Sequence, residues 1–225
     1  MRGKKGLFIG VSVVLATLVA FLPVFSTMTT AKTDVSETIR ERILAEVPLT
    51  KLSTTAPTIE KPDWYYRVVF TYTVSKNGST ADLATFAQLA NETLNDARGW
   101  SQLGIRFEQV QSGGMFNLIL AQSSQLPSYS SGCSVDWSCR AGNNVVINND
   151  RWVGASESWN NGGGSLRDYR HMVVNHEVGH WLGHDHQTCG GAGQPAPLMQ
   201  QQSIDLQGCT FNPWPLKSEL WTNRL

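Results

Sequence analysis

Apolar residues form two kinds of pattern along most of this chain. Four short segments are rich in β-branched and aromatic residues, and this composition predicts strands at residues 64–74, 104–110, 115–121 and 143–149. In two longer segments the apolar side chains instead recur every three or four residues, which predicts amphipathic helices. The first helix covers residues 81–98, and the second begins after Ser165 and continues past His180.

Polar residues with the spacing of capping boxes precede both predicted helices. Ser79 with Asp82, and Ser165 with Asp168, place a hydroxyl three residues before a carboxylate. The order is strand, helix, strands, helix and a helix-poor tail. It predicts the α+β class, with a mixed sheet that is mainly antiparallel at its edges and with two long helices.

A third pattern stands at the N-terminus, where residues 7–25 carry no charge and follow the basic segment MRGKK. Two interpretations are open: a cleaved signal peptide, or an uncleaved helix that anchors the protein in the membrane. Both export the rest of the chain, because the positive flank stays inside. We therefore expect a signal or anchor at 1–25, a polar linker at 26–62, and a folded domain at 63–225 that is secreted or membrane-anchored.

Charge and cysteine content narrow the class of protein. Basic and acidic residues number 18 each, and no basic cluster follows residue 5, so a nucleic-acid partner is not expected. Four cysteines in an exported chain suggest two disulfides. Of the three possible connectivities, local pairing of Cys133 with Cys139 and of Cys189 with Cys209 is preferred. Zinc binding by these cysteines is disfavoured, because the chain has no Cys-x-x-Cys pair.

Four of the five histidines lie in the segment HEVGHWLGHDH, residues 176–186. On a helix, His176 and His180 project from one face about one turn apart, which lets two imidazoles share one zinc ion. Glu177 is rotated to the side, where it can reach a water on the metal without binding the metal itself. This HExxH arrangement supplies two ligands and a general base.

A third ligand is needed, because a catalytic zinc has three protein ligands and one open position. His184 continues the helical row, but on an unbroken helix it would lie about 12 Å along the axis from His176, too far to share an ion. Gly183 tolerates the left-handed conformation that ends helices. A chain that turns there can bring His186 back over the first two histidines, so His186 is the expected third ligand and His184 the alternative.

With these positions the segment resembles the HExxHxxGxxH motif of the metzincin zinc peptidases. Those proteins also have a methionine in a tight turn beneath the metal, and the resemblance assigns this Met-turn to Met199 within QPAPLMQQQS. It implies a zincin-like fold with an active-site helix and a disulfide-bearing C-terminal tail. Cys189 and Cys209 would bracket the Met-turn in one loop.

A more particular resemblance is to an actinobacterial family of exported or membrane-anchored zincin-like proteins. It rests on HEVGHWLGHDH, PAPLMQQQ and LQGCTFNPWP, covers roughly residues 60–225, and implies a peptidase domain without indicating a substrate. Two positions depart from better-known metzincin groups. Gln187 after the third ligand indicates no particular group, and Gln201 stands where astacin- and serralysin-like proteins have a tyrosine.

The resulting hypothesis is a metalloendopeptidase with one catalytic Zn²⁺, in which Glu177 takes a proton from a zinc-bound water that attacks a peptide or protein substrate. The alternatives are a zinc-dependent amidase acting on cell-wall peptides, and a non-catalytic zincin-fold binding protein at the cell surface. Glu177 argues against the latter, because a binder has no need of a base. The strand at 143–149 is either an edge that could pair with an extended substrate or an interior strand. Asp185 either orients a ligand imidazole or is simply solvated.

Overall fold

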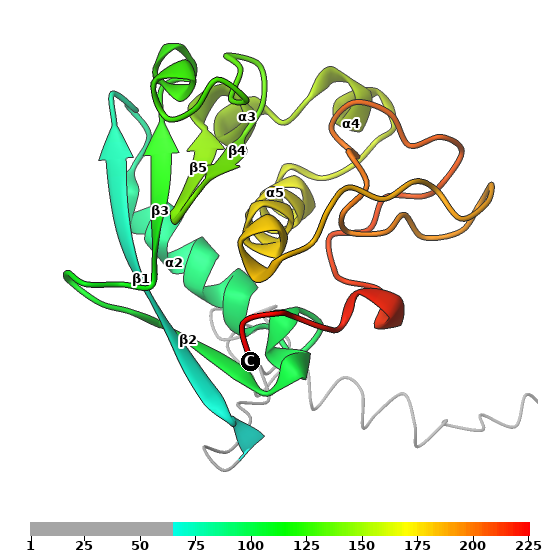
Figure 1. The fold of residues 1–225 in the computed structure, drawn as a ribbon. Coiled ribbons are helices and arrows are strands. Elements are labelled where there is room, and N and C mark those ends of the chain that lie inside the picture. Colours follow the sequence, from blue (N-terminus) through cyan, green and yellow to red (C-terminus); the bar gives the residue numbers. More distant parts are fainter. Residues whose placement is uncertain (1–64) are drawn as a thin grey trace, which may run out of the picture. The chain divides into compact units, whose positions relative to one another are not determined.

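The computed structural model describes residues 65–225, in which a five-stranded sheet and two long helices are joined by shorter helices and loops (Figure 1). The expected signal or anchor at 1–25 and the linker at 26–62 lie outside the described residues. Within residues 65–225, no helix has both the length and the apolar character needed to cross a bilayer.

The sheet has the strand order β2-β1-β3-β5-β4. Its strands are β1 (Val68–Asn77), β2 (Ile105–Gln109), β3 (Phe116–Ala121), β4 (Cys139–Ala141) and β5 (Asn144–Asn148). The four predicted strands correspond to β1, β2, β3 and β5 to within a few residues. The sequence did not indicate β4, because three residues are too short to show an alternating pattern.

The sheet is mixed, but the expectation of mainly antiparallel edges is wrong for one of its two edges. Three of the four pairings are parallel, and only β4 runs antiparallel to its neighbour. Residues 110–115 join β2 to β3, and a connection this short usually makes an antiparallel hairpin. Here β2 pairs with the first half of β1 up to Tyr72, and β3 pairs with the second half from Tyr72 onward. Residues 110–115 therefore only have to pass from one side of β1 to the other, and β3 can then continue in the same direction as β2.

The position of β5 decides between the two interpretations of residues 143–149. β5 lies between β3 and β4, so it is an interior strand and has no edge free for a substrate. The free edge on this side of the sheet belongs to β4. β4 and β5 form a hairpin through Gly142 and Asn143, and this hairpin runs close to the second long helix.

The two long helices are α2 (Leu83–Asn95) and α5 (Leu166–Leu182). Ser165 caps α5 as expected, because its hydroxyl accepts a hydrogen bond from the Asp168 backbone N–H at 3.0 Å. The expected cap of α2 was Ser79, and this is wrong. Asp82 directly precedes the helix and its carboxylate accepts from the Thr85 N–H at 2.7 Å.

Several short helices connect these elements and were not predicted. The described residues contain the α-helical turns α3 (Asn149–Gly154) and α4 (Glu157–Asn161), and the 3₁₀ helices η3 (Trp100–Leu103), η4 (Ser123–Ser128) and η5 (Lys217–Glu219). Each has at most six residues, or about two turns, so no helical period can be recognised in it.

Both long helices pack against the same face of the sheet, and the main core lies between the helices and the sheet (Figure 1). Its largest buried side chains include Phe70, Tyr72, Phe116, Trp100 and Trp181. Residues at alternate strand positions, such as Ile119 and Val146, face the other side and join a smaller cluster with η4. The thick core therefore holds α5 against β4 and β5.

The tail, residues 183–225, wraps the side of α5 that faces away from the sheet (Figure 1). It contains η5 and otherwise little regular structure, yet Leu198, Met199, Gln202 and Glu219 are all buried. Both predicted disulfides, Cys133–Cys139 and Cys189–Cys209, are formed and this prediction is confirmed. Two disulfides are typical of a protein that works outside the cytoplasm.

Candidate metal centre

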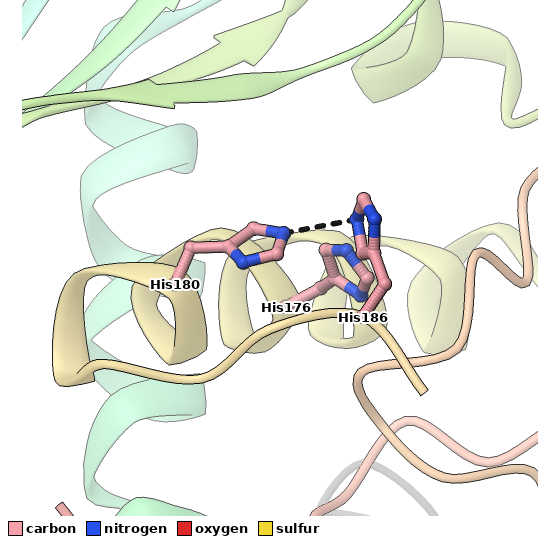
Figure 2. Close-up of side chains that lie close together, drawn as sticks. All are labelled: His176, His180 and His186. Atoms are coloured by element: carbon pink, nitrogen blue, oxygen red, sulfur yellow. Dashed lines mark hydrogen bonds between the residues drawn. The ribbon is translucent and has the colours of Figure 1, made fainter. Parts of the chain in front are cut away.

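Helix α5 carries the first two histidines of the site. His176 and His180 are one turn apart, and their ring centroids lie 4.8 Å from each other. His186 follows the end of the helix, and its ring stands over the other two (Figure 2). One nitrogen from each of the three rings lies within 4.8 Å of the others. The structure therefore brings together the three histidines expected from the sequence.

Backbone carbonyls orient the two helical histidines. The Nδ1 of His176 lies 2.9 Å from the Leu198 oxygen, and the Nδ1 of His180 lies 2.8 Å from the His184 oxygen. A carbonyl oxygen can only accept, so Nδ1 is the donor in both rings. Their Nε2 atoms are left with free lone pairs directed toward the centre, which is the tautomer that binds a metal.

Burial also favours the neutral form of these rings. Burial, together with a smaller effect of the neighbouring His180, lowers the pKa of His176 to about 3. The pKa values of His180 and His186 are lowered as well, again chiefly by burial. Neutral imidazole is the form that coordinates a metal, so near pH 7 this protein holds its three histidines ready to bind one.

Gly183 ends α5 in the left-handed conformation, with φ of 108°. The His184 N–H then donates to the Gly179 carbonyl at 3.0 Å, which closes the turn in the manner of a C-cap. This turn has two effects on the site. It sends the chain back so that His186 reaches the other histidines, and it places the His184 carbonyl where it accepts from His180.

His184, the alternative third ligand, lies outside the cluster. Its ring is buried between Trp100 and Trp221, with centroid distances of 4.9 and 4.0 Å. Its Nε2 donates to the Trp221 carbonyl at 2.9 Å. The side chain therefore packs the end of the helix against the tail, and only its backbone carbonyl serves the site.

Glu177 is buried beside the first histidine, yet it lines the same open cleft. Within residues 65–225 its Oε2 has no hydrogen-bond partner, which is uncommon for a buried carboxylate. Burial raises the pKa of Glu177 to about 8, and the positive charge of Arg140 offsets part of this rise. A carboxylate with high proton affinity that faces a cleft is suited to accept and return a proton.

Met199 lies beneath α5 in a turn where the Gln200 N–H donates to the Pro197 carbonyl at 3.0 Å. Met199 is fully buried and packs against the helix at Gly179. A Cβ at position 179 would come within 2.5 Å of the Met199 sulfur, so the close approach requires a glycine there. The same turn presents the Leu198 carbonyl that accepts from His176.

Glu219 supports this turn and was not singled out in the sequence. Its carboxylate is fully buried and accepts from the backbone N–H groups of Leu198, Met199 and Leu216, at 2.9, 2.9 and 2.7 Å. It thereby holds the peptide whose carbonyl orients His176. No motif marks Glu219, because an acidic residue in an irregular tail is most often solvated.

The walls of the cleft come from two segments on either side of α5. The Cys133–Cys139 loop and β4 form one wall, and residues 201–204 form the other. The cavity has a volume of about 330 Å³. Gln201, which stands where astacin- and serralysin-like proteins have a tyrosine, lines the second wall. Asp185 is exposed and no hydrogen bond joins it to a ligand ring, which fits the solvated alternative.

Arg140 is the second residue of the site that the sequence did not mark. It lies on β4, lines the cleft together with the three histidines and Glu177, and is exposed. A single arginine next to a cysteine carries no spacing signal. Only the pairing of β4 with β5, which brings this edge close to α5, reveals where Arg140 lies.

Comparison with known proteins places the chain in a family. A family model described as a protein of unknown function, DUF3152, matches residues 45–212. No curated protein shows a significant match. The matched region covers well over half of the sequence, so this chain belongs to the DUF3152 family.

Proposed function

We propose that this protein is a zinc-dependent metallopeptidase of the metzincin type, with His176, His180 and His186 as ligands and Glu177 as general base. The observation that carries the proposal is the convergence of three imidazoles and one buried carboxylate on one open cleft. A purely structural zinc site usually has four protein ligands. Three histidines with an adjacent base match a catalytic site better.

The geometry of the three rings fits a zinc ion. The Nε2 atoms of His180 and His186 are 3.1 Å apart (Figure 2). Two nitrogen ligands of a tetrahedral zinc, each bonded at about 2.0–2.1 Å, lie about 3.3 Å from each other. All three ligand nitrogens lie within 4.8 Å, so small side-chain rotations would complete the site. The Nδ1–H tautomer of His176 and His180 also matches the donor chemistry of zinc.

When bound, zinc would polarise a substrate carbonyl and lower the pKa of water. The protein's own contribution to the reaction is proton transfer by Glu177. Its carboxylate would accept a proton from the attacking water and then deliver it to the amine that leaves. No hydrogen bond to a described residue occupies its Oε2, so the carboxylate is not held by a competing partner there.

The free edge of β4 is the element that would align an extended peptide. Cys139 and Arg140 line the cleft, and only one side of β4 is paired in the sheet. A peptide can add to such an edge through main-chain hydrogen bonds. β4 therefore takes the role that the sequence had offered as one alternative for residues 143–149.

The lining of the cleft favours a peptide with an apolar side chain beside the reacting bond. Tyr169, Met172 and Val173 precede His176 on α5 and contribute apolar surface to the cavity. Apolar walls with a few convergent polar groups are typical of substrate sites. The cavity volume of about 330 Å³ accommodates part of a short peptide and leaves the rest on the strand edge.

Full-length protein with both disulfides formed tests the proposal. Zinc content is measured by atomic absorption, and hydrolysis is measured on casein, a peptide library and peptidoglycan fragments. Wild type is expected to bind one zinc ion and cleave peptides. Glu177→Gln is expected to retain zinc and to lose activity by about 10²–10⁴-fold, the usual contribution of a general base.

The matched control is Glu108→Gln, which removes a half-exposed carboxylate on β2 at the far edge of the sheet. It should leave both zinc content and hydrolysis unchanged. Full activity in Glu177→Gln would contradict the mechanism, and absence of zinc from wild type would contradict the whole proposal. Zinc binding without hydrolysis of any peptide would favour a binding role, and cleavage confined to peptidoglycan fragments would favour an amidase.

A further inference from the structure

Arg140 places a positive charge at the mouth of the cleft. Its side chain lines the same cavity as Glu177 and the three histidines. It belongs to β4, the free edge strand, which forms the wall opposite residues 201–204. The ion pairs among residues 65–225 join other arginines to carboxylates, and none of them involves Arg140. No hydrogen bond from its guanidinium to another described residue is formed. The charge is therefore available to a ligand.

The remaining cleft residues do not neutralise this charge. Glu177 is the one carboxylate among them, and it is buried beside His176 and used for proton transfer in the proposed mechanism. The other side chains of the lining are neutral, and they include Ser134, Ser138, Gln201 and Ser203. A group that enters the cleft along β4 therefore meets one positively charged side chain, and an anionic group is favoured there.

The surroundings of Arg140 hold it in place along the substrate path. Its backbone pairs with Val145 in the hairpin of β4 and β5, and the disulfide of Cys139 fixes the preceding residue. Its side chain lines the same cavity as Glu177 and His180. The guanidinium therefore lies on the wall of the cleft in which the reacting bond would be held.

We propose that Arg140 selects substrates that carry a carboxylate within a residue or two of the reacting bond. This inference rests on the proposed function. A peptide added to the β4 edge would place its side chains directly opposite those of the strand, where opposite charges attract. A guanidinium binds a carboxylate through two parallel hydrogen bonds, which adds geometric selectivity to the charge.

Two sources could supply this carboxylate: an Asp or Glu side chain inside a longer peptide, or the carboxylate at a peptide's C-terminus. The probes are peptides of one parent sequence in which a single Glu is moved along the chain, each with a Gln counterpart. Every peptide is made with a free and with an amidated C-terminus. A Glu preference that survives amidation identifies the side chain, and a preference for the free terminus alone identifies the C-terminal carboxylate.

The zinc-loaded wild type, Arg140→Gln and Arg140→Glu are compared in kcat/KM for each peptide pair. The same Arg140 changes are also made in the Glu177→Gln background, where peptide binding is measured by fluorescence anisotropy without turnover. The matched control is Arg106→Gln, which removes an arginine from the other edge strand, β2.

Wild type is expected to prefer the carboxylate peptide by about three- to tenfold at one position, the range for a partly solvated charge pair. Arg140→Gln should remove this preference, Arg140→Glu should reverse it in favour of the Gln counterpart, and Arg106→Gln should leave it unchanged. A Glu-to-Gln ratio that is the same in Arg140→Gln and in wild type would overturn the inference.

The binding measurement separates this inference from the proposed function. Arg140-dependent binding of carboxylate peptides by a protein that cleaves none of them would support the role of Arg140 and contradict the peptidase. Cleavage without any Arg140-dependent selectivity would support the peptidase and overturn the role of Arg140. Neither binding nor cleavage of any peptide would overturn both.

Discussion

Helix α5 and the tail (residues 183–225) supply the two halves of the candidate metal centre by different means. The helix positions His176 and His180 through its regular period, and a large apolar core holds it against the sheet. The tail has little regular structure, and buried polar side chains hold it in place. Glu219, Gln202 and Asn212 each make several hydrogen bonds to backbone groups there.

This difference shows which parts of the site depend on which forces. The helical ligands need only hydrophobic burial and a helix start, both of which are encoded locally. The tail delivers the Leu198 carbonyl to His176 and the Met199 side chain to the underside of the helix. These contacts depend on buried polar groups. Breaking one of their hydrogen bonds leaves a buried donor or acceptor without a partner, and this costs more stability than the hydrogen bond contributes on folding.

The largest stability effect is therefore expected in the tail, at Glu219. Glu219→Ala leaves the N–H groups of Leu198, Met199 and Leu216 without their acceptor. A buried donor without a partner costs about 1–3 kcal/mol, so the loss of an acceptor for three donors should lower the free energy of unfolding by about 3 kcal/mol or more. Urea denaturation of the zinc-free wild type and variant measures this difference.

Two variants make the comparison between tail and helix direct. The amide oxygen of Glu219→Gln can replace Oε2 and still accept from Leu198 and Leu216. Only one of the three hydrogen bonds is then lost, so Glu219→Gln should lose about a third as much stability as Glu219→Ala. Ser165→Ala removes the N-cap of α5 and should cost about 1 kcal/mol. A loss in Glu219→Ala no greater than that in Ser165→Ala would contradict a tail held by its buried carboxylate.

The next effect concerns the two histidines on either side of the helix end. His186→Phe removes one of the three proposed zinc ligands and should weaken zinc binding by about 10²–10³-fold, or about 3–4 kcal/mol. His184→Phe keeps an aromatic ring between Trp100 and Trp221 and should change zinc affinity less than about threefold. Competition with a chromophoric chelator measures both. Equal losses of zinc affinity in the two variants would contradict the assignment of His186.

The sequence predicted which histidines come together better than the contacts that orient them, for a physical reason. Helical spacing pairs His176 with His180, and the left-handed turn at Gly183 returns the chain to His186, so local rules sufficed. The oriented Nδ1 atoms depend on the carbonyls of Leu198 and His184. Every residue type has a carbonyl, so no pattern in the sequence could mark these two.

The same limit explains the errors in the fold. Strand composition located β1, β2, β3 and β5, but composition carries no direction, so the parallel pairing of β1 with β2 and β3 was not foreseen. β4 was missed because it has three residues, although it places Arg140 on the cleft. Residues that act through long-range pairing, such as Arg140 and Glu219, have no local signal.

The two disulfides offer a smaller test of the comparison, because one lies in the tail and the other in the loop before β4. Cys189 and Cys209 are 20 residues apart in sequence, and Cys133 and Cys139 are 6 apart. The entropy of the unfolded loop predicts losses of about 3 kcal/mol for Cys189→Ser with Cys209→Ser and about 2 kcal/mol for Cys133→Ser with Cys139→Ser. Thermal denaturation of the two double variants gives their order. A greater loss of stability in the Cys133/Cys139 variant would contradict the view that the tail depends more on its disulfide than the loop before β4 does.

The smallest effect is expected at His171, which lies on α5 where the helix meets both α2 and the tail. Its Nδ1 is 2.8 Å from the Thr93 hydroxyl, and its ring lies 5.1 Å from that of Trp214. Burial lowers the pKa of His171, and Arg167 and Arg98 lower it further. Asp168 and Asp96 act in the opposite direction.

The sign of the pH dependence follows from that lowered pKa. The folded protein disfavours protonation of His171, so below about pH 6.5 the unfolded chain binds more protons and stability falls as pH falls. His171 contributes no such loss above that range. His171→Gln should therefore lose less stability than wild type between about pH 7.5 and 5.5. Urea denaturation with a chelator present gives both slopes, and comparing slopes rather than absolute stabilities removes any packing change caused by glutamine. If stability falls with pH equally in both proteins, or more steeply in the variant, the prediction is wrong. The site of His171 would then favour the charged imidazole as much as water does.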